Sequence, residues 1–136
     1  MVCIYCSNAT NITNSRHLNR SNGTWRRRNC SICGVTFSSI ESPDYSSAWV
    51  VSKKHSKALE PFNFNKLYIS IYESLKHREK AIIEAEHLTN TIINSLSKIA
   101  MDGYINIDSL QKEAFNVLDK FDNIGALHYK AYYQKD

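Results

Sequence analysis

Apolar residues recur at helical spacing in the second half of the chain, beginning near residue 63. Asn63 can cap a first helix, and a second helix is expected over Lys80–Ile99, with Gly103 following as a stop signal. Spacings of three and four residues place the apolar side chains of each helix on one face, which predicts amphipathic helices packed on a common core. The expected core positions are Leu67, Tyr68, Ile71, Tyr72 and Leu75 in the first helix, and Ile82, Ala85, Leu88, Ile92, Leu96 and Ile99 in the second.

Two further helices are predicted towards the C-terminus. Asp108, with Gln111 three residues later, resembles a capping box that begins the third helix, and the last helix begins at about Asn123. Most of the aromatic residues in these helices are expected to belong to the core. The apolar positions are Leu110, Ala114, Val117, Leu118 and Phe121 in the third helix, and Ile124, Leu127, Tyr129, Ala131, Tyr132 and Tyr133 in the last.

A β-hairpin is predicted ahead of the helices. Ala48–Val51 has the pattern of a strand, and Ala58–Glu60 that of the returning strand, which stops at Pro61. Ile105 and Ile107 are expected to add a short strand. The hairpin and helices together number about 90 residues, which is enough for a small core. The expected fold class is therefore α+β.

The first third of the chain is rich in asparagine and poor in apolar residues, which favours short strands and turns. The polar, aperiodic stretch Ser38–Ser47 contains Pro43 and marks a domain boundary. We therefore predict an N-terminal domain at 1–42, a linker at 43–47 and a second domain at 48–136. No apolar run approaches the roughly 18 residues of a membrane span, so the protein is expected to be soluble and intracellular.

Four cysteines, the only ones in the chain, form two Cys-x-x-Cys pairs. Cys3 and Cys6 lie at the N-terminus, and Cys30 and Cys33 follow after 23 intervening residues. Tetrahedral zinc takes four thiolates at roughly 2.3 Å, and each Cys-x-x-Cys turn brings two of them to one side of the metal. Because four thiolates leave no coordination position open, the predicted zinc is structural, in a zinc ribbon.

Disulfides and a thioredoxin-like redox pair are the alternatives to zinc. A redox pair needs a βαβ context, which this polar segment lacks. Disulfides need an oxidising compartment, and the sequence has no apolar secretory segment that would direct the chain to one. Two Cys-x-x-Cys turns at this separation therefore favour zinc.

Positive charge is concentrated in the same part of the chain. Residues 1–42 carry five arginines and one acid, whereas residues 43–136 balance twelve Lys and Arg with twelve Asp and Glu. The planar fork of arginine donates two parallel hydrogen bonds, which suits phosphates and guanine edges. A compact basic module with an exposed aromatic residue indicates nucleic-acid binding, and a charged face that keeps the domain soluble is the alternative.

The arginine run has a predictable geometry. If residues 25–28 are extended, Arg26 and Arg28 share one face of the strand, while Trp25 and Arg27 share the other. Removing either Arg27 or Arg28 is expected to weaken DNA binding.

Lys66 falls in the first turn of the first predicted helix, where a cation opposes the helix dipole. An anion bound at that helix N-terminus would account for this placement. A solvated surface lysine is the alternative.

In their order and spacing, these elements resemble one family from residue 1 to about residue 134: the NrdR-type bacterial repressors of ribonucleotide reductase genes, in which a zinc ribbon precedes an ATP-cone domain. No single motif would suffice, but their succession is specific. The matching segments are Cys3–Cys6, Asn14–Arg16, Arg26–Cys33, Phe37–Glu41, Trp49–Lys53, Glu60–Leu67, Arg78 and Phe121–Tyr133.

The resemblance implies a mechanism. In this family the ribbon binds double-stranded DNA upstream of ribonucleotide reductase genes, and the cone binds ATP or dATP, which changes the oligomeric state and so controls DNA binding. For this chain it implies a repressor, not an enzyme, that forms homo-oligomers of nucleotide-dependent size in the bacterial cytoplasm, associated with the nucleoid. It implies zinc at Cys3, Cys6, Cys30 and Cys33; DNA contacts from Arg16, Arg20, Trp25, Arg26, Arg27 and Arg28; and nucleotide contacts from Val51, Lys53, Lys54, Glu60, Lys66, Arg78 and Tyr129.

The sequence departs from the family at several of these positions. Trp25 stands at the first place of a four-arginine run, and His128 replaces an arginine in the last helix. Residues 55–57 take the place of an Asp-Gly turn in the hairpin, so either Lys53 or Lys54 can be the lysine that meets the phosphates.

Two alternatives stand beside a nucleotide-responsive repressor. In the first, the cone is only a dimerisation scaffold and DNA binding is constitutive. In the second, the chain is a regulatory cone associated with an enzyme, since the same domain occurs in ribonucleotide reductases. Assignment of all four cysteines to zinc leaves no thiolate for radical chemistry and disfavours catalysis.

Overall fold

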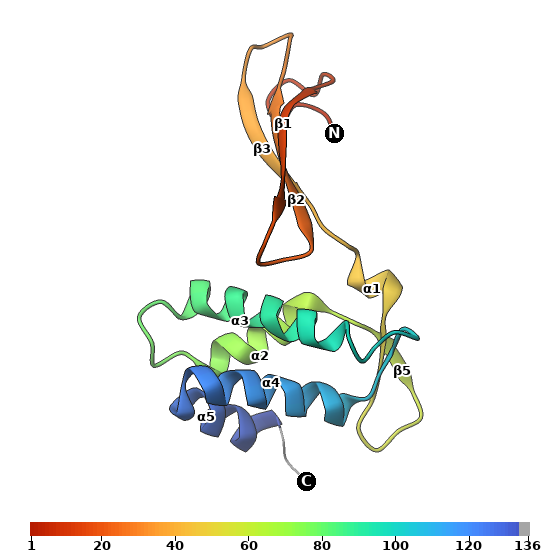
Figure 1. Cartoon of the computed structure of the whole chain (residues 1–136), viewed down its shortest axis with the longest axis vertical. Helices are drawn as coiled ribbons and strands as arrows, with labels where there is room; N and C mark the ends of the chain where they lie inside the picture. Colours follow the sequence, from red (N-terminus) through yellow and green to blue (C-terminus); the bar gives the residue numbers. More distant parts are fainter. Residues whose placement is uncertain (134–136) are drawn as a thin grey trace. The chain divides into compact units, whose positions relative to one another are not determined.

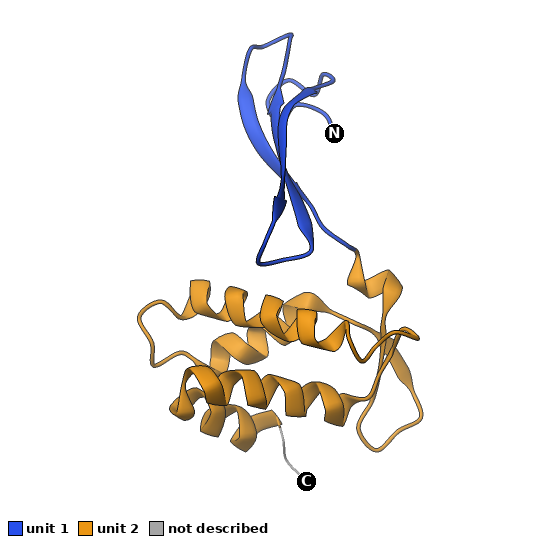
Figure 2. Ribbon diagram, in the orientation of Figure 1, with its two compact units in different colours: residues 1–43 blue, residues 44–136 orange. Residues whose placement is uncertain are grey.

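The chain divides into two compact units, which meet between Pro43 and Asp44 in the sequence, and the computed structural model describes residues 1–133 of it (Figures 1 and 2). The N-terminal unit is an antiparallel sheet in the order β1-β2-β3. Its strands are β1 (Asn11–Leu18), β2 (Gly23–Asn29) and β3 (Thr36–Glu41). The central strand contains the arginine run, and Trp25 pairs with Arg16 on one side and with Ile40 on the other. The strands predicted between the two cysteine pairs are therefore confirmed.

The stretch predicted to be aperiodic contains regular structure at both ends. Residues 38–41 belong to β3, where Ser39 Oγ accepts a hydrogen bond from Arg28 Nε at 2.8 Å. At the other end, Tyr45–Ala48 forms the one-turn helix α1, which is capped by Asp44. The sequence pattern missed both elements because their side chains are mostly polar and gain order from hydrogen bonds, not from burial.

The C-terminal unit combines a small sheet with helices. β4 (Val50–Ser52) lies at the centre of the sheet, antiparallel to β5 (Leu59–Pro61) and parallel to β6 (Tyr104–Ile105). Four helices follow the hairpin: α2 (Phe64–Ser74), α3 (Ala81–Leu96), α4 (Ile107–Phe121) and α5 (Asn123–Tyr133). The predicted α+β class is confirmed, and both hairpin strands begin one or two residues later than expected.

One hydrophobic core holds the C-terminal unit together. All four long helices contribute to it, together with residues from the hairpin. Its largest fully buried side chains are Tyr129, Phe62, Ile71, Leu75, Ile92, Leu96, Ile105 and Leu118. The predicted cap of α2 is confirmed, since Asn63 Oδ1 accepts a hydrogen bond from Lys66 N at 3.0 Å.

The predicted extent and face of α3 are partly wrong. The helix ends at Leu96, and both Ile82 and Ile99 are exposed. Thr89 and Ile93 are buried instead, and the Thr89 hydroxyl donates to the Ala85 carbonyl at 2.6 Å. A threonine that satisfies its own hydroxyl inside the helix can occupy a core position, which a purely hydrophobic pattern does not reveal.

The start of α4 also differs from the prediction. Asn106 is the N-cap, and its side chain accepts a hydrogen bond from Asp108 N at 2.8 Å, so Asp108 lies in the first turn and is not the cap. Ile107 is the first residue of the helix and not part of a strand. Asn and Asp are equally good caps, and sequence alone did not distinguish them.

The packing face of α5 is the largest correction. Ile124 and Leu127 were expected in the core but are exposed, and the helix packs through Gly125, Ala126 and Tyr129. A Cβ atom at Gly125 would lie 2.8 Å from Leu75 Cδ2. The absence of a side chain at Gly125 therefore allows α5 to approach the end of α2 closely.

Gly103→Ala is expected to destabilise the C-terminal unit by about 2 kcal/mol. Gly103 has φ of +78°, and an added Cβ would lie 2.9 Å from the carbonyl oxygen of Ala48. Its own carbonyl accepts a hydrogen bond from Val50 N at 2.8 Å, so the strained residue cannot move away freely. Urea unfolding followed by Trp49 fluorescence measures the change. Met101→Ala, which changes an exposed residue of the same loop, is the control. An unchanged urea midpoint for Gly103→Ala would show that alanine is not strained at this position.

Candidate functional site

The four cysteines meet at one end of the N-terminal unit. Their sulfur atoms all lie within 4.8 Å of one another. Cys3 Sγ is 3.6 Å from Cys33 Sγ, and Cys6 Sγ is 3.5 Å from Cys30 Sγ. A zinc ion with four sulfurs at roughly 2.3 Å in tetrahedral geometry requires sulfur–sulfur distances of about 3.8 Å. The cluster therefore fits structural zinc, with all four ligands drawn from the two turns.

The two cysteine turns have the same backbone geometry. In each, the residue after the second cysteine is left-handed: Ser7 has φ of 59° and Gly34 has φ of 73°. Its N–H donates to the carbonyl of the first cysteine, at 3.0 Å from Ser7 to Cys3 and at 2.8 Å from Gly34 to Cys30. Each turn is thus closed by its own backbone, which holds its two sulfurs on the same side.

Further N–H groups point at the sulfurs. Tyr5 N donates to Cys3 Sγ at 3.5 Å, and Asn8 Nδ2 donates to Cys6 Sγ at 3.4 Å. The Asn8 hydrogen bond is the main cause that lowers the pKa of the Cys6 thiol to about 6. Such donors favour the thiolate, which is the form that binds zinc.

The arginines of the N-terminal sheet divide between its two faces, as the alternation predicted. Arg26 and Arg28 are held within their face by neighbouring side chains. Arg26 donates to Ser15 Oγ at 3.2 Å and to Glu41 Oε2 at 3.3 Å. Arg28 donates to Ser39 Oγ at 2.8 Å and to Thr10 Oγ1 at 3.4 Å.

The opposite face carries Arg16, Trp25 and Arg27, which we call the Trp25 face. The guanidinium carbon of Arg16 lies 4.7 Å from the centre of the Trp25 ring, in a cation–π contact. Trp25 is half-buried under this contact and not freely exposed as predicted, whereas Arg27 is exposed. Arg20 lies apart from both faces, in the turn between β1 and β2. The structure thus separates six residues that the sequence treated as one group.

The C-terminal unit contains a cavity of about 150 Å³ between the hairpin and the helices. Four of the residues expected to contact nucleotide line it: Val51, Glu60, Lys66 and Tyr129. The Tyr129 side chain is only 2% exposed. Burial raises the pKa of its hydroxyl. Sequence reasoning did not assign the other cavity residues, Pro61, Phe62, Asn63, Leu67, Ser70, Ile107, Leu110, Gln111 and Tyr133, because local pattern cannot distinguish a cavity wall from a core.

Two lysines meet one carboxylate at this cavity. Lys66 Nζ lies 2.7 Å from Glu60 Oε1, and Lys53 Nζ lies 4.0 Å from Glu60 Oε2. The hydrogen bond from Lys66 is the main cause that lowers the pKa of Glu60. Lys66 therefore has an anionic partner at the start of α2, where its own charge opposes the helix dipole. Lys53 contacts the Glu60 carboxylate, but neither Lys53 nor Lys54 lines the cavity itself.

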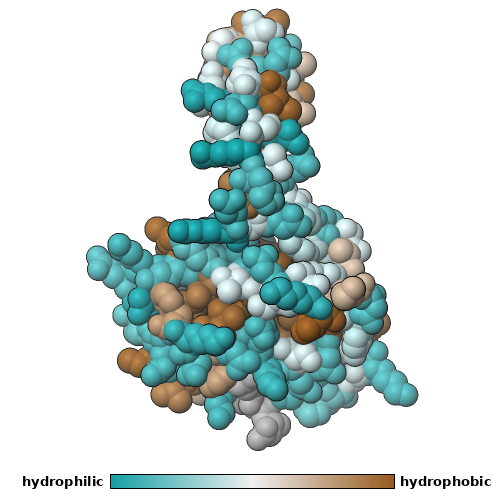
Figure 3. All heavy atoms as spheres, viewed as in Figure 1, coloured by the Kyte–Doolittle hydropathy of each residue, from teal (hydrophilic) through white to brown (hydrophobic). Residues whose placement is uncertain are grey.

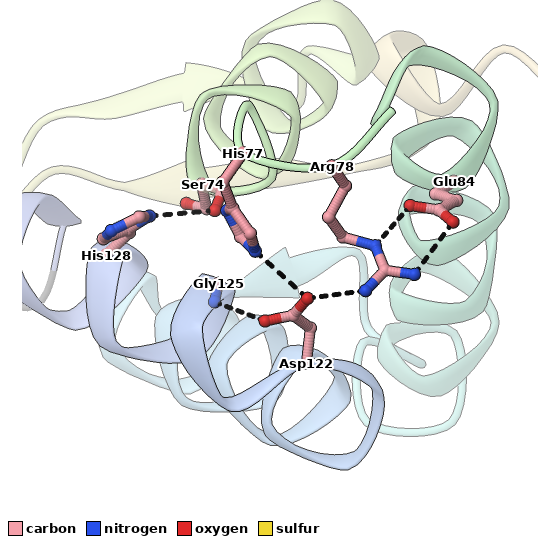
Figure 4. A network of polar contacts seen from close by, with 7 residues as sticks. All are labelled: Ser74, His77, Arg78, Glu84, Asp122, Gly125 and His128. Atoms are coloured by element: carbon pink, nitrogen blue, oxygen red, sulfur yellow. Dashed lines mark hydrogen bonds and ion pairs between the residues drawn. The ribbon is translucent and has the colours of Figure 1, made fainter. Parts of the chain in front are cut away.

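Arg78 lies away from the cavity, in a polar network at the other end of the helices (Figure 4). Its guanidinium binds Glu84 through two hydrogen bonds, of 2.6 and 3.0 Å, and Asp122 through one of 2.7 Å. Burial raises the pKa of Asp122, but its hydrogen bonds from Gly125 N, Arg78 and His77 outweigh this effect and hold it well below the usual range. Arg78 is thus committed to two carboxylates.

The helices within residues 1–133 include none long and apolar enough to cross a membrane.

Comparison with known proteins found a family model that matches the N-terminal unit and relatives that match along most of the chain. Residues 1–41 match the family model described as "Transcriptional repressor NrdR-like, N-terminal domain". Proteins named Transcriptional repressor NrdR from Brucella ovis and Brucella canis are each 28% identical to this chain over 135 residues, covering 98% of this chain and 84% of theirs. The resemblance seen in the sequence is thereby confirmed: residues 1–41 match the N-terminal zinc ribbon of NrdR-like transcriptional repressors, and the chain is similar to such repressors along 98% of its length.

Proposed function

We propose that this protein is a nucleotide-responsive, zinc-dependent repressor that binds double-stranded DNA upstream of ribonucleotide reductase genes. The observation that carries the proposal is the union of a zinc ribbon and a separate ligand cavity in one chain. The ribbon supplies a basic surface that can bind an anion such as DNA but carries no catalytic groups. The second unit supplies a cavity in which a small-molecule ligand can bind. Such a protein belongs in the bacterial cytoplasm, at the nucleoid, and is not an enzyme.

DNA contacts are proposed for the Trp25 face. Arg27 is exposed there, and Arg16 and Trp25 lie beside it as a stacked pair. An arginine on a flat sheet surface can reach phosphates or guanine edges without losing contacts inside the protein. Arg26 and Arg28 would have to exchange hydrogen bonds with Ser15, Glu41, Ser39 and Thr10 to do the same.

ATP and dATP are the proposed ligands of the cavity. Its walls are mostly apolar, which suits a base or sugar, and the lysines beside Glu60 suit phosphates. Tyr129, which is buried and lines the cavity, would contact the ligand. Arg78 is no longer proposed as a contact, because its guanidinium lies in a separate network.

Homo-oligomers are proposed to form through the C-terminal unit. Ile124 and Leu127 expose apolar side chains on the outer face of α5, and Ile82 and Ile83 do so on α3. Figure 3 shows hydrophobic groups at several places on the surface of this unit, between polar ones. Contacts between copies would cover such groups.

A constitutive DNA-binding protein with a scaffold cone is the second candidate. It is favoured by the pairing of Lys53 and Lys66 with Glu60, which already neutralises part of the positive charge at the cavity. The two candidates differ in whether nucleotide alters DNA binding.

The test uses zinc-loaded full-length protein and a labelled duplex from upstream of the ribonucleotide reductase genes. We expect ATP and dATP to change the oligomer mass seen by light scattering and to give DNA affinities that differ about tenfold, within the usual range of allosteric coupling. Lys66→Ala should remove this difference and leave the affinity without nucleotide unchanged, and a scrambled duplex controls for sequence-independent binding. If the oligomer mass and the DNA affinity are the same without nucleotide, with ATP and with dATP, the protein is instead a constitutive DNA-binding protein with a scaffold cone.

A further inference from the structure

The network around Arg78 joins three helices of the C-terminal unit. His77 and Arg78 follow α2, Glu84 lies in the first turn of α3, and Asp122 precedes α5 (Figure 4). Asp122 Oδ2 accepts from Arg78 Nη1 at 2.7 Å and lies 3.1 Å from His77 Nε2. Its other oxygen, Oδ1, accepts from Gly125 N at 2.9 Å and so caps α5. We call Arg78, Glu84 and Asp122 the Arg78 clamp.

The clamp is shielded from water on several sides. The Asp122 side chain is 9% exposed and that of Glu84 is 20% exposed. The guanidinium of Arg78 lies 4.7 Å from the centre of the Phe121 ring, which covers one of its faces. Loss of one partner would leave a poorly solvated charge behind, so the clamp responds to substitution more strongly than a surface ion pair.

Two further contacts hold the same end of α5 against α2. The carbonyl of Ser74 accepts a hydrogen bond from His128 Nδ1 at 3.2 Å, so this nitrogen carries the proton. Gly125 lies against Leu75 so closely that a Cβ would be 2.8 Å from its Cδ2. These contacts hold the N-terminal half of α5 close to the end of α2, beside the clamp.

The same helix forms a wall of the cavity. Asp122 and Tyr129 are seven residues apart, which places them two turns apart on one face of α5. Tyr129 is buried and lines the cavity. Tyr133, one turn later, also lines the cavity. A rotation or shift of α5 at the clamp would therefore move the Tyr129 hydroxyl within the cavity.

We infer that the Arg78 clamp positions α5 for ligand binding, so that Arg78 and Asp122 govern nucleotide affinity without touching the nucleotide. This inference rests on the proposed function of the cavity. Coupling of this kind is reciprocal: a ligand that needs α5 in its docked position also stabilises the clamp. Arg78 is thus a positioning residue.

The test compares dATP affinity, by calorimetry, in zinc-loaded full-length variants that circular dichroism shows to be folded. Asp122→Asn keeps a capping oxygen for Gly125 but removes the charge that binds Arg78. We expect it to lower dATP affinity about tenfold. Arg78→Gln should lower it at least as much, because it also removes the two hydrogen bonds to Glu84. The double variant should lose no more than Arg78→Gln alone, because that change already removes the Arg78–Asp122 contact. Glu73→Gln, which breaks the exposed ion pair between Glu73 on α2 and Lys76 just after that helix, should have no effect.

Hydrogen exchange of the α5 amides gives a reading that does not depend on nucleotide. We expect faster exchange over residues 123–133 in Asp122→Asn, with α3 unchanged. Unaltered α5 exchange, or a dATP affinity equal to that of the parent, would overturn the inference. If the parent itself binds no dATP, the proposed nucleotide site fails and the coupling with it, whereas α5 exchange still reports whether the clamp holds the helix.

Discussion

Removal of zinc with a chelator, or replacement of Cys30 by serine, is expected to unfold residues 1–43 and leave the C-terminal unit folded. Within residues 1–43 the buried positions are Cys3, Gly23 and Cys30, so the N-terminal unit has no hydrophobic core apart from two metal ligands. Structural zinc contributes on the order of 10 kcal/mol to the folding of such modules. The core of the C-terminal unit lies entirely within residues 49–129.

Two-dimensional NMR of the amide groups measures this effect separately in each unit. Signals of β1, β2 and β3 should collapse to unfolded positions when zinc is removed and return when it is added back, while signals of α2–α5 stay in place. DNA binding should be lost together with the ribbon signals. Ser31→Ala, which alters the second cysteine turn but none of its sulfurs, is the control. A dispersed ribbon spectrum in protein shown to contain no zinc would contradict the prediction.

Arg27→Ala and Arg28→Ala are expected to act differently on DNA binding. Arg27 is exposed on the Trp25 face, so its loss should weaken affinity about tenfold, or about 1.4 kcal/mol, and lower the salt slope by about one. Arg28 is engaged with Ser39 and Thr10, so Arg28→Ala should have a smaller effect on affinity. The sequence alone assigned both residues the same effect, and the hydrogen bonds distinguish them.

Fluorescence anisotropy at several salt concentrations measures both quantities. Lys112→Ala removes the same charge from the C-terminal unit and should leave the salt slope unchanged. Arg27→Lys should recover part of the affinity if Arg27 binds phosphate, but none if it reads a guanine edge, because only arginine offers the fork. Equal losses for Arg27→Ala and Arg28→Ala at every salt concentration would show that both faces of the sheet contact DNA.

Features encoded over a few residues were predictable from the sequence. The spacing of Cys3, Cys6, Cys30 and Cys33 identified the metal cluster, because each turn closes with a hydrogen bond across four residues. The cap of α2 followed from Asn63 for the same reason, since its partner is three residues away. The alternation of Trp25, Arg26, Arg27 and Arg28 needed only the geometry of a strand.

Features that depend on distant residues were not predictable. The packing face of α5 is set by Gly125 meeting Leu75, 50 positions earlier in the chain, and hydrophobicity pointed to Ile124 and Leu127 instead. Arg78 was grouped with the nucleotide contacts through the family resemblance, and its contact with Asp122, 44 residues away, could not be read from a local pattern. The cavity itself combines residues from the hairpin and three helices, and periodicity cannot show where their packing is incomplete.

The parallel pairing of β4 with β6 has a consequence for synthesis of the chain. Val50 pairs with Tyr104, and the residues between them form β5, α2 and α3, so this sheet cannot be completed until the chain has grown past Ile105. All four cysteines have by then long been made. Because domains fold in order as they leave the ribosome, the ribbon can take up zinc while the second unit is still unfinished. The N-terminal unit can therefore acquire its metal and fold before the C-terminal unit is complete.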